Sequence, residues 1–367
     1  MKIVRRKTRS VKIGNIFIGS THPVAIQSMA KTRTADIEKT IAQIKKLESC
    51  GCEIVRVAVK DSADAAAIKK IKSKIMIPLV ADIHFNWQLA MEAIESGADK
   101  IRLNPGNIFR SAQIREVVAA AKLSGIPIRV GINSGSLRDR RGNSQADKMV
   151  RSALDYIKIL EGFKFHDTVI SLKASSILDT IEAYRKMAKL CDYPLHLGVT
   201  ATGTPFAGVI KSSVALGALL QEGIGDTIRI SLTDKPEQEV ICAKIILESL
   251  GLRRFGPEII SCPTCGRCEV DLVRIVRELE GKLSTMDYRL WTRPPKVAVM
   301  GCVVNGPGEA EVADIGVAFG KKEGLLFKRG SPVRKVSFAD CANVLLNELK
   351  NLRTKELKNR RAKYALV

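Results

Sequence analysis

The sequence has few aromatic residues, and its acidic residues are far outnumbered by basic ones. Phe, Trp and Tyr make up 5% of the 367 residues, whereas apolar residues make up 46%. The core must therefore be built mainly from Ile, Val, Leu and Ala, and the aromatic platforms that stack single-stranded nucleic acid are not expected. There are 38 Asp and Glu against 60 Lys and Arg, a formal charge of +22. Such a charge is typical of proteins that bind nucleic acid, an acidic protein or a small phosphorylated ligand.

Other signals are missing as well. No segment approaches the run of about 18 apolar residues that marks a membrane-spanning helix, and the first nine residues lack the apolar stretch of a signal peptide. The nine cysteines are an odd number, which argues against a disulfide framework. No Gly-x-Gly-x-x-Gly follows the first expected strand, so a dinucleotide site has no support. These absences predict a soluble, cytoplasmic protein that does not bind membranes.

Eight short apolar runs alternate with amphipathic helical patterns over the first 250 residues, and Gly or Pro stands at most junctions. This alternation predicts an α/β fold with a parallel sheet. Eight units in about 250 residues favour a closed (β/α)8 TIM barrel over an open doubly wound sheet. The expected strands are Pro23–Met29, Glu53–Val59, Ile77–Ile83, Asp99–Asn104, Ile126–Ile132, Asp167–Lys173, Pro194–Val199 and Asp226–Leu232. The expected helices include Asp36–Ser49, Trp87–Ser96, Gln113–Leu123, Lys148–Leu160, Gly208–Gln221 and Glu237–Leu250.

The pattern changes after Leu252, where Arg253–Pro257 resembles a linker. We therefore expect a barrel domain at residues 1–253 and a small α+β domain at residues 254–367. Its expected elements are a helix at Val270–Leu283, strands at Lys296–Met300, Asp314–Phe319 and Gly324–Lys328, and a last helix at Phe338–Leu352. The basic tail at residues 355–363 is expected to be a solvated, frayed end.

Charged and polar residues gather late in the expected strands. Side chains alternate across a strand, so residues two or four apart point to the same face. The pairs are Asp82 with His84, Arg102 with Asn104, Arg129 with Asn133, and Arg229 with Ser231, while Arg56 and Lys173 hold equivalent places in the second and sixth units. A single strand-end arginine is most often only a solvated residue. Five cations from five strands, with Asp82 as the one matching acid, predict a bound anion at the active end of the barrel, such as a diphosphate.

A group of cysteines opens the second domain. They are Cys262, Cys265 and Cys268, with Cys302 farther along the chain. Without a sign of secretion, this spacing favours a metal or iron–sulfur site over disulfides. The run Asn305–Gly308 predicts a turn that delivers Glu309, and three thiolates with one carboxylate would leave one exchangeable coordination position. In the alternative, the four cysteines are the ligands and Glu309 is only a turn residue.

Several motifs of the chain carry a family resemblance. They are Ala25–Met29, Ala81–Phe85, Arg102–Asn107, Val130–Ser136, Cys262–Cys265 and Gly301–Glu309. From about Val11 to the last helix, the chain resembles the 4-hydroxy-3-methylbut-2-enyl diphosphate synthases of the non-mevalonate isoprenoid pathway. The resemblance implies reductive ring opening and dehydration of 2-C-methyl-D-erythritol 2,4-cyclodiphosphate, with two electrons delivered through a 4Fe-4S cluster. It also implies that Cys262, Cys265, Cys302 and Glu309 hold the cluster, that Cys268 is a spare, and that the barrel cations bind the diphosphate.

The resemblance implies partners and further site residues. Ferredoxin or flavodoxin would donate the electrons, and no nucleic acid would take part. The candidates for proton handling or orientation are Asp82, His84, His196 and Glu309, and Thr200 joins the substrate-binding residues. Relatives carry a glutamate after the stretch Leu197–Thr200, but this chain has Ala201. Water, Glu309 or another group must then deliver the proton.

The chain order also predicts an assembly. The last barrel helix, about 14 residues long, carries the chain roughly 21 Å back from the active end of the barrel. A short linker hardly spans the return. We therefore expect a head-to-tail homodimer, in which each cluster domain covers the barrel of the other subunit, as the resemblance also implies.

Two rival functions explain less of the sequence. A nucleic-acid-binding protein with a structural zinc site accounts for the charge and the cysteines, but not for cations at strand ends. A radical S-adenosylmethionine enzyme usually carries Cys-x-x-x-Cys-x-x-Cys inside its barrel, whereas here both the spacing and the location differ.

Overall fold

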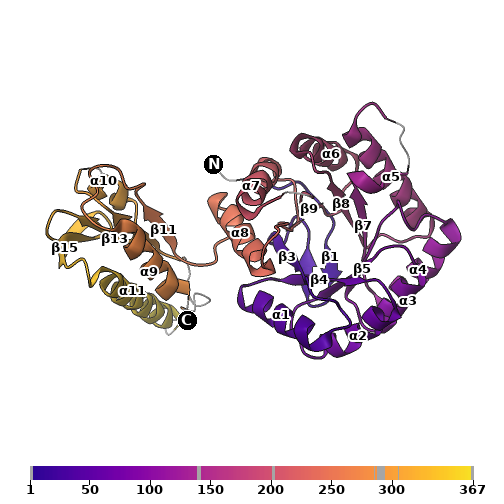
Figure 1. The fold of residues 1–367 in the computed structure, drawn as a ribbon, viewed down its shortest axis with the longest axis horizontal. Helices are drawn as coiled ribbons and strands as arrows, with labels where there is room; N and C mark the ends of the chain where they lie inside the picture. The colour runs from indigo at the N-terminus through magenta and orange to yellow at the C-terminus, as the bar shows by residue number, and fades with distance from the viewer. Residues whose placement is uncertain are drawn as a thin grey trace. The chain divides into compact units, whose positions relative to one another are not determined.

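The chain folds into two compact units, Met1–Arg253 and Arg254–Val367, each built around its own main sheet (Figure 1). The computed structural model describes residues 3–138, 142–200, 203–284, 286, 294–304 and 306–364. In this described part of the chain, no helix is both long and apolar enough to cross a membrane.

The first unit is a parallel barrel of eight strands. Their order in the sheet is β8-β7-β6-β5-β4-β3-β10-β9, and a bridge between Ile170 and Leu195 joins its two edges. The predicted TIM barrel is therefore confirmed. The strands are β3 (Ala25–Met29), β4 (Ile54–Val59), β5 (Leu79–Ile83), β6 (Lys100–Leu103), β7 (Ile128–Asn133), β8 (Thr168–Lys173), β9 (His196–Leu197) and β10 (Thr227–Ile228).

Helices surround the barrel strands in the described part of the first unit, and local sequence signals mark several of their ends (Figure 1). Ser144 and Asp147 form a capping box at the start of α5, which satisfies backbone N–H groups that lack partners in the first turn. Gly125 ends α4 in the left-handed conformation that glycine adopts without steric cost. The helices are α1 (Ile37–Ser49), α2 (Ser62–Lys72), α3 (Gln88–Glu95), α4 (Ser111–Ser124), α5 (Gln145–Gly162), α6 (Ile177–Leu190), α7 (Pro205–Gln221) and α8 (Pro236–Ser249).

An N-terminal hairpin of β1 (Val11–Ile13) and β2 (Ile16–Ile18) closes one end of the barrel. Val11, Ile13 and Ile18 are buried against residues at the beginnings of four barrel strands, namely Ala25, Ile54, Val80 and Val169. Each such buried aliphatic side chain contributes roughly 1.5–3 kcal/mol. The hairpin, which the sequence analysis did not predict, leaves the opposite end of the barrel for the polar residues.

The second unit is a mixed five-stranded sheet with helices on both faces. Its strands, in sheet order, are β11 (Glu258–Ser261), β12 (Lys296–Met300), β13 (Ile315–Phe319), β14 (Gly324–Lys328) and β15 (Ser331–Val336). Val297 and Val299 pack with α9 (Leu272–Ser284) and α11 (Cys341–Tyr364). The alternate residues Ala298 and Met300 pack with Ala310 of α10 (Gly306–Glu311), as the two-residue period of a strand requires. The predicted α+β character is confirmed.

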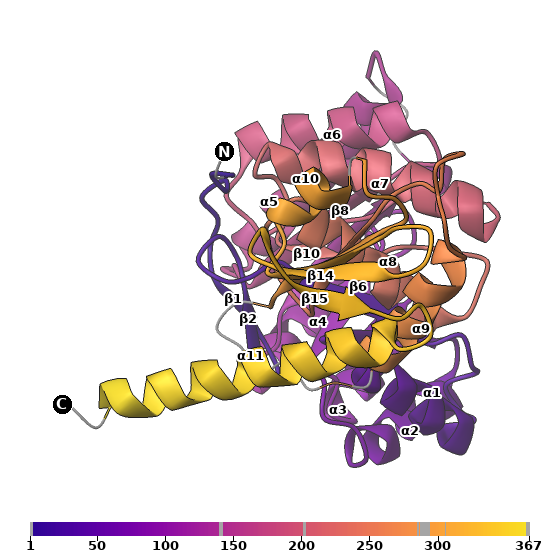
Figure 2. The same cartoon turned by 90° about the vertical axis from the view of Figure 1, so that its left-hand side faces the viewer.

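Three details of this unit differ from the sequence prediction. The expected turn at Asn305–Gly308 is wrong from Gly306 onward, because α10 begins there; Asn305 itself lies outside the described residues. Pro307 fits the first turn of a helix, where its missing N–H has no intrahelical partner to lose. The last helix does not end near Leu352 but continues to Tyr364 (Figure 2). Strands β11 and β15 were not predicted, and the strand pairing of β15 with β14 includes a bulge near Leu326.

Candidate active site

The register of the barrel strands brings the predicted polar residues into the barrel interior. Asp82 pairs with Arg102 across β5 and β6, and Arg102 pairs with Arg129 across β6 and β7. Asn133 pairs with Lys173 across β7 and β8. We call this region, at the C-terminal ends of the strands, the barrel mouth. Its members Arg56, Asp82, Arg102, Asn104, Arg129 and Lys173 are all buried.

Asp82 is the anion around which these cations are arranged. Its carboxylate lies 3.2 Å from Arg102 Nη1 and 3.7 Å from Arg56 Nε, and His84 Nε2 is 3.7 Å away. Burial alone would raise the pKa of Asp82, but the charges of Arg56, Arg102 and Arg129 outweigh burial and lower it to about 2. Asp82 is therefore an anion at physiological pH. It orients the arginines and cannot supply a proton.

Arg129 is a fully buried basic residue of the barrel mouth. None of its three guanidinium nitrogens has a hydrogen-bond acceptor among the residues that the structure describes. Burial, followed by the nearby Arg56 and Arg102, lowers the pKa of Arg129 well below its usual range. The charge of Asp82 offsets part of this effect, but a buried charge without a hydrogen-bonded counter-charge costs several kcal/mol. An anionic ligand that reached Arg129 would remove this cost.

Two glycines make room for the cations. A Cβ atom at Gly131 would lie 2.2 Å from Arg102 Nε, and one at Gly198 would lie 2.6 Å from Lys173 Nζ. Arg102 also donates a hydrogen bond of 2.7 Å to the Gly131 carbonyl. Any larger residue at either position would displace a charged side chain from the barrel interior.

Lys100 is a further buried cation that the sequence analysis missed. It stands two residues before Arg102 on β6, so it points to the same side of the strand. Its side chain is fully buried, and within the described structure Nζ has no hydrogen-bond partner. Burial, and then Arg129 and Arg56, lower the pKa of Lys100 well below its usual range. The two-residue spacing that identified Asn104 could have found it.

His196 is placed to orient Lys173. Its Nε2 lies 3.4 Å from Lys173 Nζ, and its Nδ1 lies 2.7 Å from Thr227 Oγ1. Burial, and then the charges of Arg129 and Lys173, lower the pKa of His196 well below its usual range. The imidazole is therefore neutral, accepts from the lysine through Nε2 and donates to Thr227 through Nδ1. Of the two roles expected from the sequence, this arrangement favours orientation over proton transfer.

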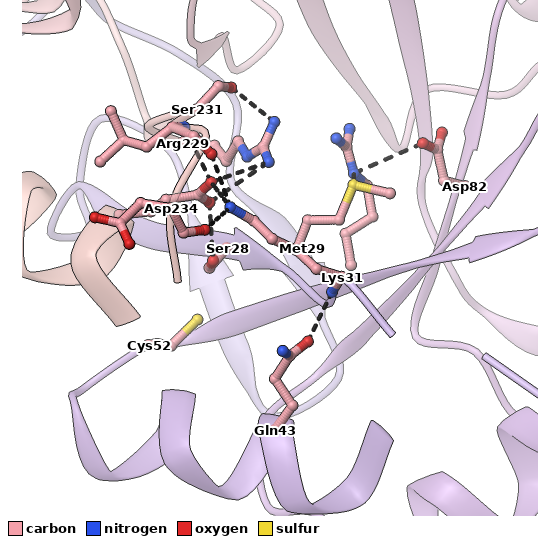
Figure 3. A network of polar contacts seen from close by, with 12 residues as sticks. Ser28, Met29, Lys31, Gln43, Cys52, Asp82, Arg229, Ser231 and Asp234 are labelled. Atoms are coloured by element: carbon pink, nitrogen blue, oxygen red, sulfur yellow. Dashed lines mark hydrogen bonds and ion pairs between the residues drawn. The ribbon is translucent and has the colours of Figure 1, made fainter. Parts of the chain in front are cut away.

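Arg229 belongs to a second ion network at the mouth (Figure 3). It donates to Ser231 Oγ over 2.7 Å, and its Nη2 lies 3.4 Å from Glu239 Oε2. Glu239 is buried in the first turn of α8 and also pairs with Lys31 over 3.1 Å. Ser28 Oγ donates to the same carboxylate over 3.2 Å. Sequence reasoning missed Glu239 because the acid sits on a helix rather than on a strand end.

The remaining predicted barrel residues lie at or near the rim. Asn104 donates to Ser136 Oγ over 2.9 Å, and its Oδ1 accepts from the Gly106 N–H over 3.0 Å, so it shapes the loop after β6. The His84 side chain is 45% exposed and open to solvent. Thr200 is half-buried and its N–H bonds the Ala174 carbonyl. Ala201 lies outside the described residues.

The second unit brings the cysteine loop, residues 261–268, against the chain at Gly301. The Gly301 N–H donates to Cys262 Sγ over 3.3 Å. A Cβ atom at Gly301 would lie 2.3 Å from Cys268 Sγ and 3.4 Å from Cys262 Sγ. Cys302 follows directly and is buried, whereas Cys265 is exposed. The glycine thus leaves space for two thiol groups of the cysteine loop next to the backbone that carries Cys302.

The donor chemistry of this loop fits an iron–sulfur group. Clustered cysteine thiolates are the usual ligands of iron–sulfur clusters and of zinc. Within the described ranges, no three His, Cys, Asp or Glu side chains are close enough together to hold a single metal ion. The side chain of Glu309 lies outside the described residues, although its backbone belongs to α10. The geometry therefore leaves both predicted ligand sets open, with Cys268 or with Glu309.

A closed barrel with a cationic mouth, followed by a cysteine-bearing α+β unit, defines a two-part barrel protein. The family model described as GcpE TIM-barrel domain matches residues 8–244. The model described as GcpE protein C-terminal domain matches residues 258–351. The chain belongs to the GcpE family.

Curated relatives agree with this assignment. A protein of Bacillus pumilus (strain SAFR-032) is 54% identical over 94% of this chain and 93% of its own length. A protein of Bacillus cereus (strain Q1) is 53% identical over 94% of this chain and 93% of its own length. Both are named 4-hydroxy-3-methylbut-2-en-1-yl diphosphate synthase (flavodoxin). The resemblance found in the sequence and the prediction of an enzyme are confirmed.

Solved structures resemble the barrel alone. Dihydropteroate synthase from Stenotrophomonas maltophilia aligns with a TM-score of 0.52 and 14% identity, over 67% of this chain and 100% of its own. The Yersinia pestis enzyme aligns with a TM-score of 0.50 and 11% identity, over 66% of this chain and 98% of its own. At such identities the likeness shows the fold and carries no function.

Proposed function

We propose that the chain catalyses the reductive ring opening and dehydration of 2-C-methyl-D-erythritol 2,4-cyclodiphosphate to 4-hydroxy-3-methylbut-2-enyl diphosphate, in non-mevalonate isoprenoid biosynthesis. When substrate and product are both written as fully protonated acids, the reaction consumes two electrons and two protons and releases one water molecule. The observation that carries the proposal is the set of buried cations around Arg129, whose guanidinium has no acceptor within the described structure. Family membership selects the substrate among possible diphosphates.

The barrel mouth would bind the diphosphate. Arg56, Arg102, Arg129, Lys173 and Arg229 supply the charge. Asn104, Asn133, Thr200 and Ser231 supply neutral hydrogen bonds. A hydrogen bond to a charged group contributes roughly 1.5–3 kcal/mol, and burial keeps solvent from screening these charges. Asp82 holds Arg56 and Arg102 in place, so the arginines need little reorganisation when the ligand binds.

The second unit would hold a 4Fe-4S cluster through Cys262, Cys265, Cys302 and Glu309. When bound, such a cluster supplies single electrons and an iron whose carboxylate ligand is exchangeable. The residues of the chain must then bind the ring, exclude water and deliver protons. His84 at the rim and Glu309 are our candidates for proton delivery, because the environments of Asp82 and His196 oppose that role.

Electrons would come from a flavodoxin, as the names of the Bacillus relatives indicate for those proteins, with ferredoxin as the alternative donor. We also propose a cytoplasmic location, where free thiols stay reduced. The two units would act together across a homodimer, with the barrel of one subunit and the cluster of the other forming each site. The return of α8 to the closed end of its own barrel supports this arrangement.

Anaerobic purification and turnover test the proposal. We expect a brown protein with iron and sulfide in equal amounts, which converts the cyclodiphosphate when a reduced flavodoxin is supplied. Arg129→Ala should raise KM at least tenfold and keep the visible spectrum, whereas Arg115→Ala, on the exposed face of α4, should change neither. A colourless protein with stoichiometric zinc and no turnover would overturn the proposal.

A further inference from the structure

The lower half of the barrel interior, toward the closed end, contains polar side chains as well as hydrocarbon. The inward-facing side chains of such a barrel stack in layers, and each layer is supplied by alternate strands. The strand register places two of these layers one above the other near the closed end. The upper layer consists of Gln27, Val80, Arg129 and His196. The lower layer consists of Ile54, Lys100, Val169 and Thr227.

The contacts of neighbouring residues show that Gln27 points into the barrel. Ala25, two residues earlier on β3, packs against the hairpin of β1 and β2 at the closed end. Met29, two residues later, accepts a hydrogen bond of 3.1 Å from Arg56 Nε through its Sδ. Side chains two residues apart on a strand share a face. Gln27 therefore lies on the inner face of β3, as Lys100 lies on the inner face of β6 below Arg102.

Three side chains of the two layers have polar atoms without a partner, and we call them the lower polar cluster. Gln27 is 1% exposed, and Lys100 and Arg129 are completely buried. Among the residues that the structure describes, no hydrogen-bond partner contacts either amide atom of Gln27, Lys100 Nζ or the guanidinium nitrogens of Arg129. His196 and Thr227, by contrast, bond to each other over 2.7 Å. Buried polar groups normally have a partner, so these three side chains indicate a bound ligand.

The charges around the lower polar cluster favour an anion as this ligand. The neighbouring charges that shift the pKa of Lys100 are those of Arg129 and Arg56, and both lower it. Ammonium and guanidinium groups only donate hydrogen bonds, and the amide of Gln27 can turn its NH2 group toward a ligand. A cation would be repelled, and water alone would leave the basic groups without a counter-charge. An anion satisfies both the donors and the charge.

A ligand at the barrel mouth leaves part of the positive charge uncompensated. The basic side chains of the described interior are Arg56, Lys100, Arg102, Arg129, Lys173 and Arg229. The acids that face them are Asp82 and Glu239. The cyclic diphosphate of the proposed function has only one ionised oxygen on each phosphorus, so the basic groups outnumber all these negative charges together. This comparison alone rests on the proposed function.

We propose that the lower polar cluster binds a small monovalent anion of halide size, at a site beneath the diphosphate. Lys100 and Arg129 supply the counter-charge, and Gln27 donates through its amide. The size is limited because Ile54, Val80 and Val169 surround this part of the interior with hydrocarbon that packs on the hairpin. The anion stays in place while substrate and product exchange at the mouth. It holds Arg129 in position for the ligand above and takes no part in the reaction.

Thermal unfolding in two sodium salts tests the site. The ligand-free protein would be compared in bromide and in gluconate at equal ionic strength, because gluconate carries the same charge but is too large for the site. An ion that binds only the folded protein raises the unfolding temperature in a saturable way. We expect this response to bromide for the wild type and for Lys69→Met, which changes an exposed lysine of α2. Lys100→Met should bind bromide at least tenfold more weakly.

Gln27→Glu is an independent second variant with nearly the same shape as the wild type. Its carboxylate would take the place of the anion beside Lys100, so the response to bromide should disappear. This variant keeps the test decisive if Lys100→Met does not fold. A bromide response that is unchanged in either folded variant would overturn the proposal.

Crystals grown in bromide would locate the ion by its anomalous scattering. We expect bromide in contact with Lys100 Nζ and the Gln27 amide, both without and with inorganic pyrophosphate. Displacement of bromide by pyrophosphate would mean that the ion had occupied the diphosphate site, and would overturn the proposal. Water alone between these side chains would overturn it as well. None of these measurements uses turnover, so a failure of the proposed function would leave their result intact.

Discussion

Lys100 and Arg129 lie on the neighbouring strands β6 and β7, and both are completely buried without an acceptor among the residues that the structure describes. Asp82 interacts with Arg129, but neither basic group has a hydrogen-bonded acid of its own, and burying two such groups side by side raises the free energy of the ligand-free protein. The barrel is therefore less stable when empty than when an anion is bound. Substitution of Lys100 or Arg129 measures how much each residue contributes to this difference.

Replacement of Arg129 should separate stability from binding. We expect Arg129→Met to raise the free energy of unfolding of the ligand-free protein by roughly 1–3 kcal/mol, because a buried, unpaired charge is replaced by an apolar side chain of similar length. The same variant should lose the stabilisation that inorganic pyrophosphate gives to the wild type. Thermal unfolding with and without pyrophosphate measures both effects. A variant that is less stable than the wild type when empty would contradict this account of Arg129.

Lys100 should take up a proton when an anion binds. Its pKa is lowered by burial, and then by Arg129 and Arg56, so the amine is neutral over part of the pH range in which an ordinary lysine is charged. A diphosphate favours the charged form. Calorimetry of pyrophosphate binding, repeated in buffers with different ionisation enthalpies, gives the number of protons taken up. We expect Lys100→Met to take up fewer protons than the wild type when pyrophosphate binds. Lys122→Met, on the outside of α4, should take up as many as the wild type.

Asp82 should contribute an acid-dependent part of the stability. Its pKa falls from an ordinary value of 3.8 to about 2 in the folded protein. A lowered pKa stabilises the fold above the unfolded value, and this stability is lost as the pH falls from about 4 to 2. The shift corresponds to roughly 2 kcal/mol. The difference in unfolding free energy between wild type and Asp82→Asn should shrink as the pH falls from about 4 to 2. A difference that stays constant over this range would show that the ionised Asp82 carboxylate does not stabilise the fold.

The cysteine loop offers a direct test of the ligand set. Cys302→Ala should lose the bound iron, whereas Cys268→Ser should keep iron, sulfide and turnover. The reason is that Cys262, Cys265, Cys302 and Glu309 suffice as ligands in our proposal. Iron analysis and visible absorbance after anaerobic purification distinguish the two variants. A colourless Cys268→Ser protein would instead assign the fourth position to Cys268, whose Sγ lies beside Gly301.

The barrel could be predicted because its signals are local. Each strand is a short apolar run between Gly, Pro or polar residues, and the two-residue period of a strand is enough to place Arg102 and Asn104 on one face. The same period extends to Lys100, which was overlooked because it stands at the beginning of the strand rather than at its end.

Other features depend on contacts between distant segments and could not be predicted in this way. Glu239 reaches Arg229 only because the first turn of α8 packs over the end of β3. The strands β1 and β2 have only three residues each, too few to show the alternation of apolar and polar residues. They form because their apolar side chains pack against the closed end of the barrel. The start of α10 at Gly306 was misjudged because Gly and Pro usually mark turns, and packing against Met300 and Ala318 overrides that preference.

Among the residues that the structure describes, the hairpin of β1 and β2 closes one end of the barrel and leaves the other end for exchange with solvent. Val11, Ile13 and Ile18 fill the base with hydrocarbon, so no ion or polar product can leave through the bottom. Substrate, water and product must then use the same passage in opposite directions. A product molecule that stays at this end therefore blocks the entry of the next substrate molecule.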